Sequence, residues 1–139
     1  GNLVQYPWTG NWLYTAQRVT GLVTMAYIGF HVWEQRFAGV HIISHPEVAF
    51  AKVQHSIARP EVLLFYVVGL LAACFHFAYG VWLFACKWGF APGLRAQKRL
   101  LWACMGLFVI LSGAGLASLR SFSTTPLQPT PERIVSTRP

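Results

Sequence analysis

Charged residues are scarce in this sequence of 139 residues, and acidic residues are the scarcest of all. Asp and Glu together number four, and charged residues make up 11% of the chain, against about 25% in an ordinary soluble domain. Apolar residues make up 55%. The shortage of charge argues against a soluble domain, and the composition favours a membrane protein.

Several familiar motifs are missing as well. The cysteines Cys74, Cys86 and Cys104 are widely spaced in apolar runs, and neither C-x-x-C nor C-x-x-C-H occurs. This spacing argues against a zinc site, thioredoxin-like chemistry and covalently attached haem, and it favours small packing residues. The net charge of +7 follows from the shortage of acids. Because no basic run with interleaved aromatics occurs, we expect no nucleic-acid partner.

Long apolar segments are what the sequence does contain. Three of them, at about 12–37, 61–87 and 98–120, are long enough to span a membrane as helices, since about 20 residues cross a hydrocarbon core of about 30 Å. None alternates with period two, which argues against strands. The sequence therefore predicts an all-α membrane protein, with three spanning helices forming one transmembrane bundle over residues 1–120.

Two further segments differ from these spans. Pro46 and Glu47 suit the first turn of a helix, and apolar residues then recur on one face. This pattern predicts a short helix at about 46–58 lying on the membrane surface. Residues 121–139 are rich in Ser, Thr and Pro, so we expect a disordered tail.

The connection between the second and third spans is basic. It holds Lys87, Arg95, Lys98 and Arg99 and no acidic residue. Cytoplasmic loops of membrane proteins are enriched in Lys and Arg. We therefore expect this turn on the cytoplasmic side of the membrane.

A stripe of polar residues runs down the first apolar segment. At about 100° per residue, four polar side chains fall within about 40° of His31, namely Gln17, Thr20, Thr24 and Gln35. A polar stripe on a spanning helix faces protein or a cofactor rather than lipid. Arg18 lies off this stripe, near one end of the segment.

The second apolar segment also carries a histidine at its middle. Gly69 and Gly80 lie within about 40° of His76 on the helix surface. Small residues around an imidazole leave room for a broad, flat group. Lys87 lies on the same face about 16 Å further along, where its ammonium group is placed to meet a carboxylate at the membrane surface.

Haem fits both histidines. Neutral imidazole is a good iron ligand, and a porphyrin needs an apolar slot with polar contacts for its propionates. The alternative is a buried histidine hydrogen-bonded to a neighbouring helix. Counted from the helix ends, His31 and His76 differ in depth by on the order of 10 Å. Because the two axial ligands of one iron lie nearly level, we infer two haems, each taking its second ligand from helices outside this sequence.

These features occur together in a known family. The segments NW at 11–12, QRVTG at 17–21, HVWE at 31–34, YVVG at 66–69 and FHF at 75–77 follow one another at the family's spacing. In this order they make the chain resemble the cytochrome b membrane-anchor subunit of succinate:quinone oxidoreductases (succinate dehydrogenase and fumarate reductase), of the five-helix, two-haem type. The resemblance covers about residues 8–120 and corresponds to the last three of the five helices.

The resemblance implies a set of site residues. Four histidines on four helices bind two b haems in that family. By position, His31 is an axial ligand of the haem nearer the outer face, and His76 is an axial ligand of the haem nearer the cytoplasm. Candidate contacts to haem propionates or partner subunits are Lys87, Gln17, Arg18 and Arg59. No catalytic residue is implied in this chain.

The resemblance also implies partners and a location. The anchor binds a flavoprotein (FAD) subunit and an iron–sulfur subunit on the inner side of the cell's cytoplasmic membrane, which it crosses several times. It serves the respiratory chain and the tricarboxylic acid cycle, passing electrons between the iron–sulfur subunit and membrane quinone. The family's first two helices lie upstream or on a separate chain. Two alternatives stay open, a structural anchor without functional haem and a single-haem transmembrane cytochrome.

Overall fold

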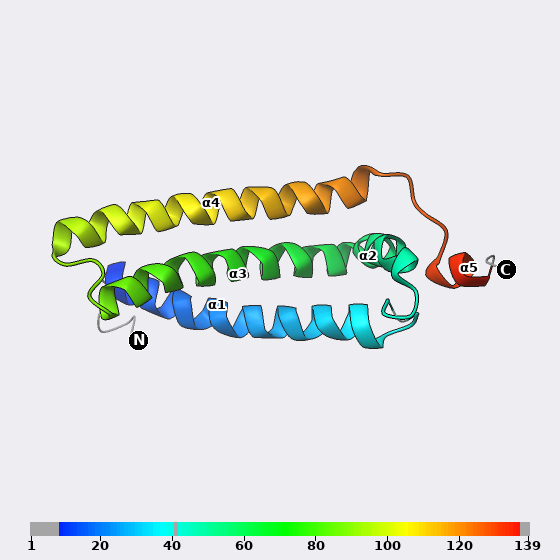
Figure 1. The fold of residues 1–139 in the computed structure, drawn as a ribbon, viewed down its shortest axis with the longest axis horizontal. Helices are drawn as coiled ribbons and strands as arrows, with labels where there is room; N and C mark the ends of the chain where they lie inside the picture. The colour runs from blue at the N-terminus through cyan, green and yellow to red at the C-terminus, as the bar shows by residue number, and fades with distance from the viewer. Residues whose placement is uncertain (1–8, 41, 137–139) are drawn as a thin grey trace.

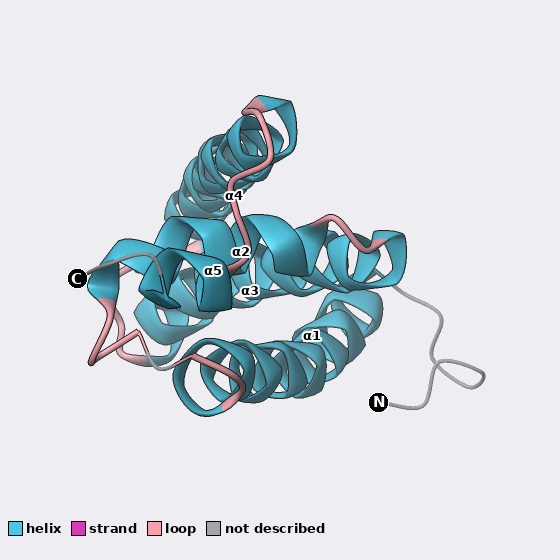
Figure 2. Ribbon diagram, turned by 90° about the vertical axis from the view of Figure 1, so that its right-hand side faces the viewer, coloured by secondary structure: helices cyan, strands magenta, loops and turns pink. Residues whose placement is uncertain are grey.

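Three long helices form the body of the protein. The structure is a computed structural model that describes residues 9–40 and 42–136, and within these ranges it contains helices and connections but no strands. The long helices are α1 (Thr9–Val32), α3 (Pro60–Lys87) and α4 (Leu94–Thr124). They lie side by side with α3 in the middle, as the two ribbon views agree (Figures 1 and 2). The all-α class predicted from the sequence is confirmed.

Two of the three long helices have the length and composition of membrane spans. Both α3, with 28 residues, and α4, with 31, contain an 18-residue window with a mean hydropathy of 2.1. α1 has 24 residues, about 36 Å at 1.5 Å per residue, so its length also suits a span. Its hydropathy is lower because the polar stripe around His31 interrupts the apolar residues, and the third span therefore stays a prediction.

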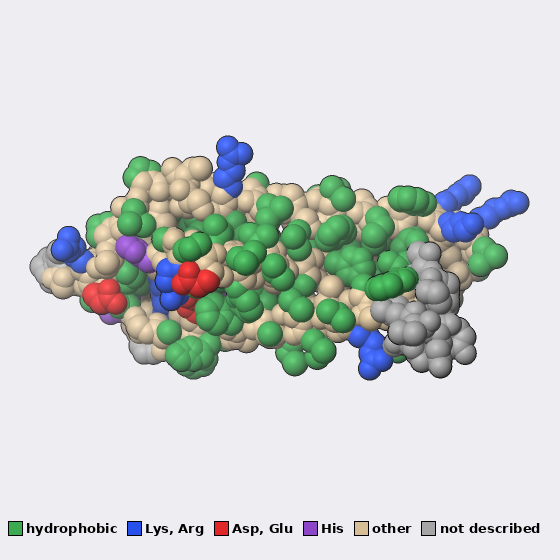
Figure 3. Space-filling model, turned by 180° about the vertical axis from the view of Figure 1, so that it is seen from behind, with side chains coloured by type: hydrophobic (Ala, Val, Ile, Leu, Met, Phe, Trp, Pro, Cys, Tyr) green, Lys and Arg blue, Asp and Glu red, His purple; other side chains and the backbone are tan. Residues whose placement is uncertain are grey.

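The surface of the bundle is apolar along its length and charged at its ends. Figure 3 shows hydrophobic side chains over the middle of the molecule and most charged side chains toward the two ends. Large apolar residues on all three long helices are exposed, among them Leu22, Met25, Val68, Phe77, Trp102 and Ile110. A soluble monomer rarely exposes so continuous an apolar surface. The arrangement is typical of helices that contact lipid or other membrane helices.

The two ends of the bundle are built differently. One end, called the turn end here, carries the turn between α3 and α4. The other, called the α2 end, carries the π-helix η1 (Trp33–Phe37), the 3₁₀-helix η2 (Pro46–Val48), α2 (Ala49–Ile57) and α5 (Pro131–Ser136). In Figure 1, α2 crosses this end of the long helices. Ile57 of α2 packs with Val62 and Tyr66 of α3 in a buried cluster, which fixes α2 against the bundle.

The third long helix exceeds its expected bounds. The sequence predicted about 98–120, whereas α4 runs from Leu94 to Thr124. Gly93 has φ of 83°, a left-handed conformation that glycine adopts without strain, and the helix starts directly after it. Hydropathy marks only the apolar part of this helix, because its first turns carry Arg95, Lys98 and Arg99.

The C-terminal segment also differs from its expectation. Residues 121–139 were expected to be disordered, but residues 121–124 belong to α4 and Pro131–Ser136 form α5. The physical reason lies in Gln54 of α2, which is buried. Its Nε2 donates to the carbonyls of Phe122, Thr125 and Pro126, and its Oε1 accepts from the main-chain N–H of Gln128. Residues 137–139 lie outside the described residues.

Candidate functional site

His76 lies in α3 against the first turns of α1. Its Nδ1 is 3.0 Å from the main-chain carbonyl oxygen of Gln17. A carbonyl oxygen only accepts hydrogen bonds, so Nδ1 carries the proton. In the neutral imidazole, Nε2 then holds the free lone pair. The side chain of Gln17 returns the contact, because its Nε2 donates to the main-chain carbonyl of His76 at 3.1 Å.

Gly21 leaves the space in which the His76 ring lies. A Cβ atom at Gly21 would stand 2.9 Å from Cε1 of His76 and 3.7 Å from Nε2. A contact of 2.9 Å is closer than carbon atoms tolerate, so any larger residue would displace the imidazole. Glycine at this position of the QRVTG segment therefore allows α1 to approach the ring of His76.

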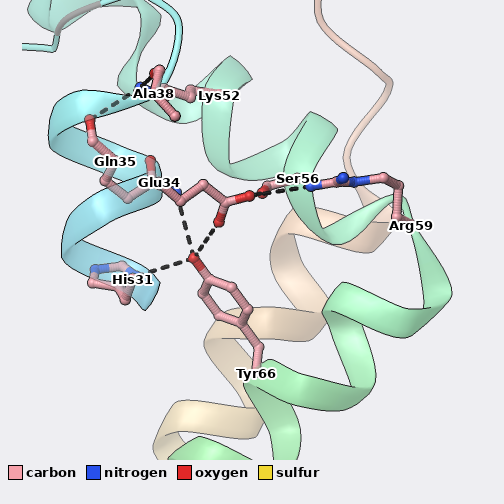
Figure 4. A network of polar contacts seen from close by, with 8 residues as sticks. All are labelled: His31, Glu34, Gln35, Ala38, Lys52, Ser56, Arg59 and Tyr66. Atoms are coloured by element: carbon pink, nitrogen blue, oxygen red, sulfur yellow. Dashed lines mark hydrogen bonds and ion pairs between the residues drawn. The ribbon is translucent and has the colours of Figure 1, made fainter. Parts of the chain in front are cut away.

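His31 lies near the other end of α1 and belongs to a larger polar network (Figure 4). Its Nδ1 is 3.1 Å from the hydroxyl oxygen of Tyr66, and that hydroxyl donates to Oε2 of Glu34 at 2.9 Å. Because the single phenolic proton points to the carboxylate, the Tyr66 oxygen accepts from His31 Nδ1–H. As in His76, Nε2 is then the nitrogen with the free lone pair.

Two helices, α2 and α3, and the connection between them hold the carboxylate of Glu34. Besides Tyr66 of α3, Ser56 of α2 donates to Oε1, and Arg59 forms an ion pair with the same oxygen at 3.2 Å. The side chain of Glu34 is 13% exposed, whereas that of Arg59 is 57% exposed. An ion pair this open to solvent contributes at most about 1 kcal/mol. The part-buried hydrogen bonds from Ser56 and Tyr66 therefore hold Glu34 more firmly than the exposed contact of Arg59 does.

Lys52 closes the same network from α2. Its Nζ donates to the main-chain carbonyls of Gln35, Ala38 and Val40, at and beyond the end of η1. Carbonyls at a helix C-terminus lack intrahelical partners, and a cation there is favourable. Burial lowers the pKa of Lys52 below its ordinary value of 10.5, and the charge of Glu34 acts in the opposite direction.

The two histidines lie at different levels of the bundle. His31 contacts Tyr66, and His76 lies ten positions further along α3, which corresponds to about 15 Å. On α1, His76 lies against Gln17 and Gly21, ten to fourteen positions before His31 and again at least about 15 Å away. Two axial nitrogens of one iron would lie about 4 Å apart, with bonds of about 2 Å each. This arrangement cannot supply both ligands to a single iron.

The polar stripe of α1 faces α3, but α3 does not supply hydrogen-bond partners for all of its polar atoms. Among the described residues, Gln17 Oε1, Thr24 Oγ1 and Gln35 Oε1 are buried without a hydrogen-bond partner. Buried polar atoms normally have partners, and each exception needs an explanation. All three belong to the stripe around His31, so this side of α1 is where a further group or helix would be accommodated.

The donor chemistry of the two sites suits haem. No group of three or more His, Cys, Asp or Glu side chains that could hold a bare metal ion occurs in residues 9–40 and 42–136. Haem needs only one imidazole nitrogen on each side of its iron. His31 and His76 each have Nδ1 engaged and Nε2 as the lone-pair nitrogen, and a ligating histidine normally donates its other N–H in this way. As donors, the two imidazoles therefore fit haem, one at each level.

Comparison with known proteins decides the family. Residues 2–115 match the succinate dehydrogenase/fumarate reductase transmembrane subunits. The chain belongs to this family. The resemblance stated from the sequence motifs is thereby confirmed.

A named relative agrees with this family assignment. The chain is similar to the succinate dehydrogenase cytochrome b558 subunit of Bacillus subtilis (strain 168), with 38% identity over 121 residues. The alignment covers 87% of this chain and 58% of that relative, so the chain spans little more than half of the relative's length. No solved structure matches the chain.

The structure brings some of the predicted site residues of this transmembrane subunit to the histidines. Gln17 contacts His76, and Arg59 reaches the network of His31 through Glu34. The structure does not bring the other two candidates to a histidine. Arg18 is exposed with its guanidinium 5.7 Å from the ring centre of Tyr14, and Lys87 is exposed in the last turn of α3.

The glycines beside His76 serve a different purpose from the one expected. A Cβ at Gly69 would lie 2.3 Å from Cγ of Tyr27, and a Cβ at Gly80 would lie 3.3 Å from Nε2 of Gln17. Side chains of α1 therefore fill the space over both glycines. In this structure the small residues allow α1 and α3 to pack closely, rather than leaving an open slot.

Three residues of the His31 network were missed in the sequence. Tyr66 lay in the recognised YVVG segment but had no role, and Ser56 and Lys52 lay in a helix assigned to the membrane surface. Ser56 and Lys52 are buried although both are polar. The available signal was the spacing of Lys52 and Ser56, which lie four positions apart and therefore on one face of the predicted short helix.

Proposed function

We propose that this chain is part of a cytochrome b membrane anchor and contributes one axial ligand to each of two b haems. His31 serves the haem at the α2 end, and His76 serves the haem at the turn end. The second ligand of each haem comes from helices outside these 139 residues. The observation that carries the proposal is the pair of imidazoles about 15 Å apart in level, each with Nε2 as its lone-pair nitrogen.

The chain's own residues hold the two ligands in a binding tautomer. A bis-histidine haem supplies an iron that gains and loses one electron and leaves no open position for oxygen chemistry. At His76, the main-chain carbonyl of Gln17 keeps the proton on Nδ1. At His31, the hydroxyl of Tyr66 does the same, and Glu34 fixes that hydroxyl. Both rings are thereby oriented before haem binds.

The proposed complex transfers electrons between succinate or fumarate chemistry and membrane quinone. Its flavoprotein and iron–sulfur subunits dock at the turn end, on the cytoplasmic side of the cell membrane. Net charge supports this orientation, because the turn end carries Lys87, Arg95, Lys98 and Arg99 without an acidic residue, whereas the basic residues of the α2 end lie among all four acidic residues. Lys and Arg near the ends of spanning helices favour the cytoplasm.

The remaining polar candidates are assigned by their position. Gln17, Arg18 and Lys87 lie toward the turn end, and Arg59 lies at the α2 end. We propose them as contacts of haem propionates or of the partner subunits. The exposure of Arg18 and Lys87 in the chain alone supports this assignment, because an exposed cation can meet a carboxylate, and Arg59 already pairs with the carboxylate of Glu34.

The haem content of the purified complex tests the proposed function. Haem is quantified against protein, and reduced-minus-oxidised spectra are recorded during a redox titration. Two haems per complex with two resolved potentials support the proposal. One haem per complex would contradict the proposal, and a complex without haem would favour a structural anchor.

A further inference from the structure

Tyr66 is held rigidly beside His31. Its side chain is 3% exposed and packs with Ile57 and Val62 in the buried cluster at the α2 end. Its ring also meets Tyr27 edge-on, with 5.6 Å between ring centres. The phenol therefore has little freedom to turn, and the position of its hydroxyl is set by packing rather than by the bond to His31.

The hydrogen bonds from His31 run in one direction to a carboxylate. His31 Nδ1–H donates to Tyr66, the Tyr66 hydroxyl donates to Glu34 Oε2, and Glu34 Oε1 accepts from Ser56 and Arg59. Gln35 Nε2 approaches the same hydroxyl at 3.4 Å. A phenol whose proton is bound to a carboxylate is a stronger acceptor than a free one, since hydrogen bonds in a chain polarise one another.

His76 has a different partner for its Nδ1–H. That partner is the main-chain carbonyl of Gln17, a neutral acceptor that no side-chain substitution removes. The two histidines therefore donate to different acceptors. His76 donates to a peptide carbonyl, and His31 donates to a phenol that is itself hydrogen-bonded to a carboxylate. Outer partners of ligating histidines change the basicity of the ligand and the properties of the metal.

We propose that Tyr66 is a positioning residue for His31 and lowers the midpoint potential of the haem at the α2 end, with Glu34 orienting the hydroxyl proton of Tyr66 and making its oxygen a stronger acceptor. This inference rests on the proposed function, in which His31 is an axial ligand. A stronger acceptor on Nδ1–H makes the imidazole more electron-rich, which favours ferric over ferrous iron. The bond also fixes the plane of the His31 ring about its bond to the iron.

The test uses the intact membrane complex with Tyr66→Phe and Glu34→Gln in the full-length anchor. Tyr66→Phe removes the hydroxyl and keeps the ring, and Glu34→Gln keeps an oxygen that Tyr66 can reach but removes the charge. Tyr27→Phe is the matched control, because Tyr27 packs against Tyr66 and His31 but its hydroxyl is not part of the hydrogen bonds that link His31, Tyr66 and Glu34. Haem content, both midpoint potentials and the low-field EPR resonance of each ferric haem are measured.

Tyr66→Phe is expected to retain two haems and to raise the potential of the haem at the α2 end. The expected change in its redox equilibrium is at least about threefold, or about 28 mV at 59 mV per tenfold for one electron. Its EPR resonance also moves, because that signal depends on the angle between the axial imidazole planes. Glu34→Gln shifts the potential in the same direction by less. The potential and EPR resonance of the haem at the turn end stay unchanged in both variants. In the Tyr27→Phe complex, the potentials and resonances of both haems stay unchanged.

Two results would overturn the inference. One is an unchanged potential and EPR resonance for the α2-end haem in both variants, and the other is an equal shift of both haems, which indicates a general structural effect. If Tyr66→Phe loses that haem, Glu34→Gln decides by the same readouts. His31→Ala is prepared in parallel and identifies the α2-end haem by its loss. If His31→Ala keeps both haems, the proposed function fails before the role of Tyr66 is in question.

Discussion

His76 and Gln17 exchange two hydrogen bonds across the contact between α1 and α3. His76 Nδ1 donates to the main-chain carbonyl of Gln17 at 3.0 Å, and the Gln17 amide donates to the carbonyl of His76 at 3.1 Å. The reciprocal pair fixes the register of the two helices and the tautomer of the imidazole together. The ring is thereby held over Gly21, where the chain offers no side chain.

Gly21→Ala is expected to disturb the haem at the turn end and not the haem at the α2 end. The added methyl group would lie 2.9 Å from Cε1 of His76, so either the ring turns or α1 moves away. Overpacking of this kind costs about 1–3 kcal/mol. We expect loss or a shifted spectrum of one of the two haems, measured by haem quantification and reduced-minus-oxidised spectra.

Gly29→Ala is the control for this prediction. Gly29 lies on the same helix, and a Cβ there would meet no atom within 4 Å. The substitution also removes a glycine from a helix, which favours the helix by about 1 kcal/mol. The Gly29→Ala complex should keep both haems unchanged. Equal haem loss in the two variants would show that the close approach to His76 is unimportant.

Lys52→Met is expected to destabilise the α2 end. The substitution keeps the length of the side chain but removes a cation that donates to three main-chain carbonyls at the end of η1. A hydrogen bond to a charged group contributes about 1.5–3 kcal/mol, and the buried carbonyls would be left without their donor. We expect the thermal midpoint of the purified complex to fall by several degrees.

Arg120→Met serves as the reference for that measurement, because Arg120 is exposed in α4 and lies away from the turn end. Loss of an exposed charge changes stability by less than about 0.5 kcal/mol. A thermal midpoint for Lys52→Met no lower than that for Arg120→Met would contradict the assigned role of Lys52 as a cap on the helix end.

Gln54→Leu is expected to release the C-terminal segment from α2. The amide of Gln54 binds three carbonyls between Phe122 and Pro126 and also the N–H of Gln128. Loss of about 1.4 kcal/mol, the net worth of one or two hydrogen bonds, would raise the open population of this segment about tenfold. Limited trypsin cleavage after Arg133 should then proceed about tenfold faster.

Ser123→Ala provides the comparison for the proteolysis experiment. The Ser123 hydroxyl is exposed and bonds only one turn back, to the carbonyl of Leu119, so its loss should leave the cleavage rate unchanged. If Gln54→Leu is cleaved no faster than Ser123→Ala, Gln54 does not hold the segment.

The levels of the two histidines could be predicted from the sequence, but only roughly. Counting residues from the ends of the apolar segments gave a difference in level on the order of 10 Å. This value is imprecise because the ends of apolar segments are poorly defined. Contacts between helices give the register directly. His31 against Tyr66, and His76 against Gln17, place the difference at about 15 Å.

The polar network around His31 could not be predicted from local patterns. The sequence placed Gln35 on the stripe of His31, but the roles of Tyr66 and Ser56 depend on how α2 folds back onto the end of α3. That fold depends on buried contacts such as Ile57 with Val62 and Tyr66, between residues that no helical period relates. The C-terminal segment was misjudged for the same reason, since Gln54 and Gln128 are 74 positions apart.

The most direct test of the central claim is the haem content of complexes carrying His31→Ala or His76→Ala, with His45→Ala as the control. His45 is a partly exposed histidine before η2 that contacts Glu47, so its loss should leave two haems. Each of the other two variants should retain one haem, and the retained haems should differ in midpoint potential. Loss of both haems or of neither in either variant, or loss of the same haem in both, would contradict the account.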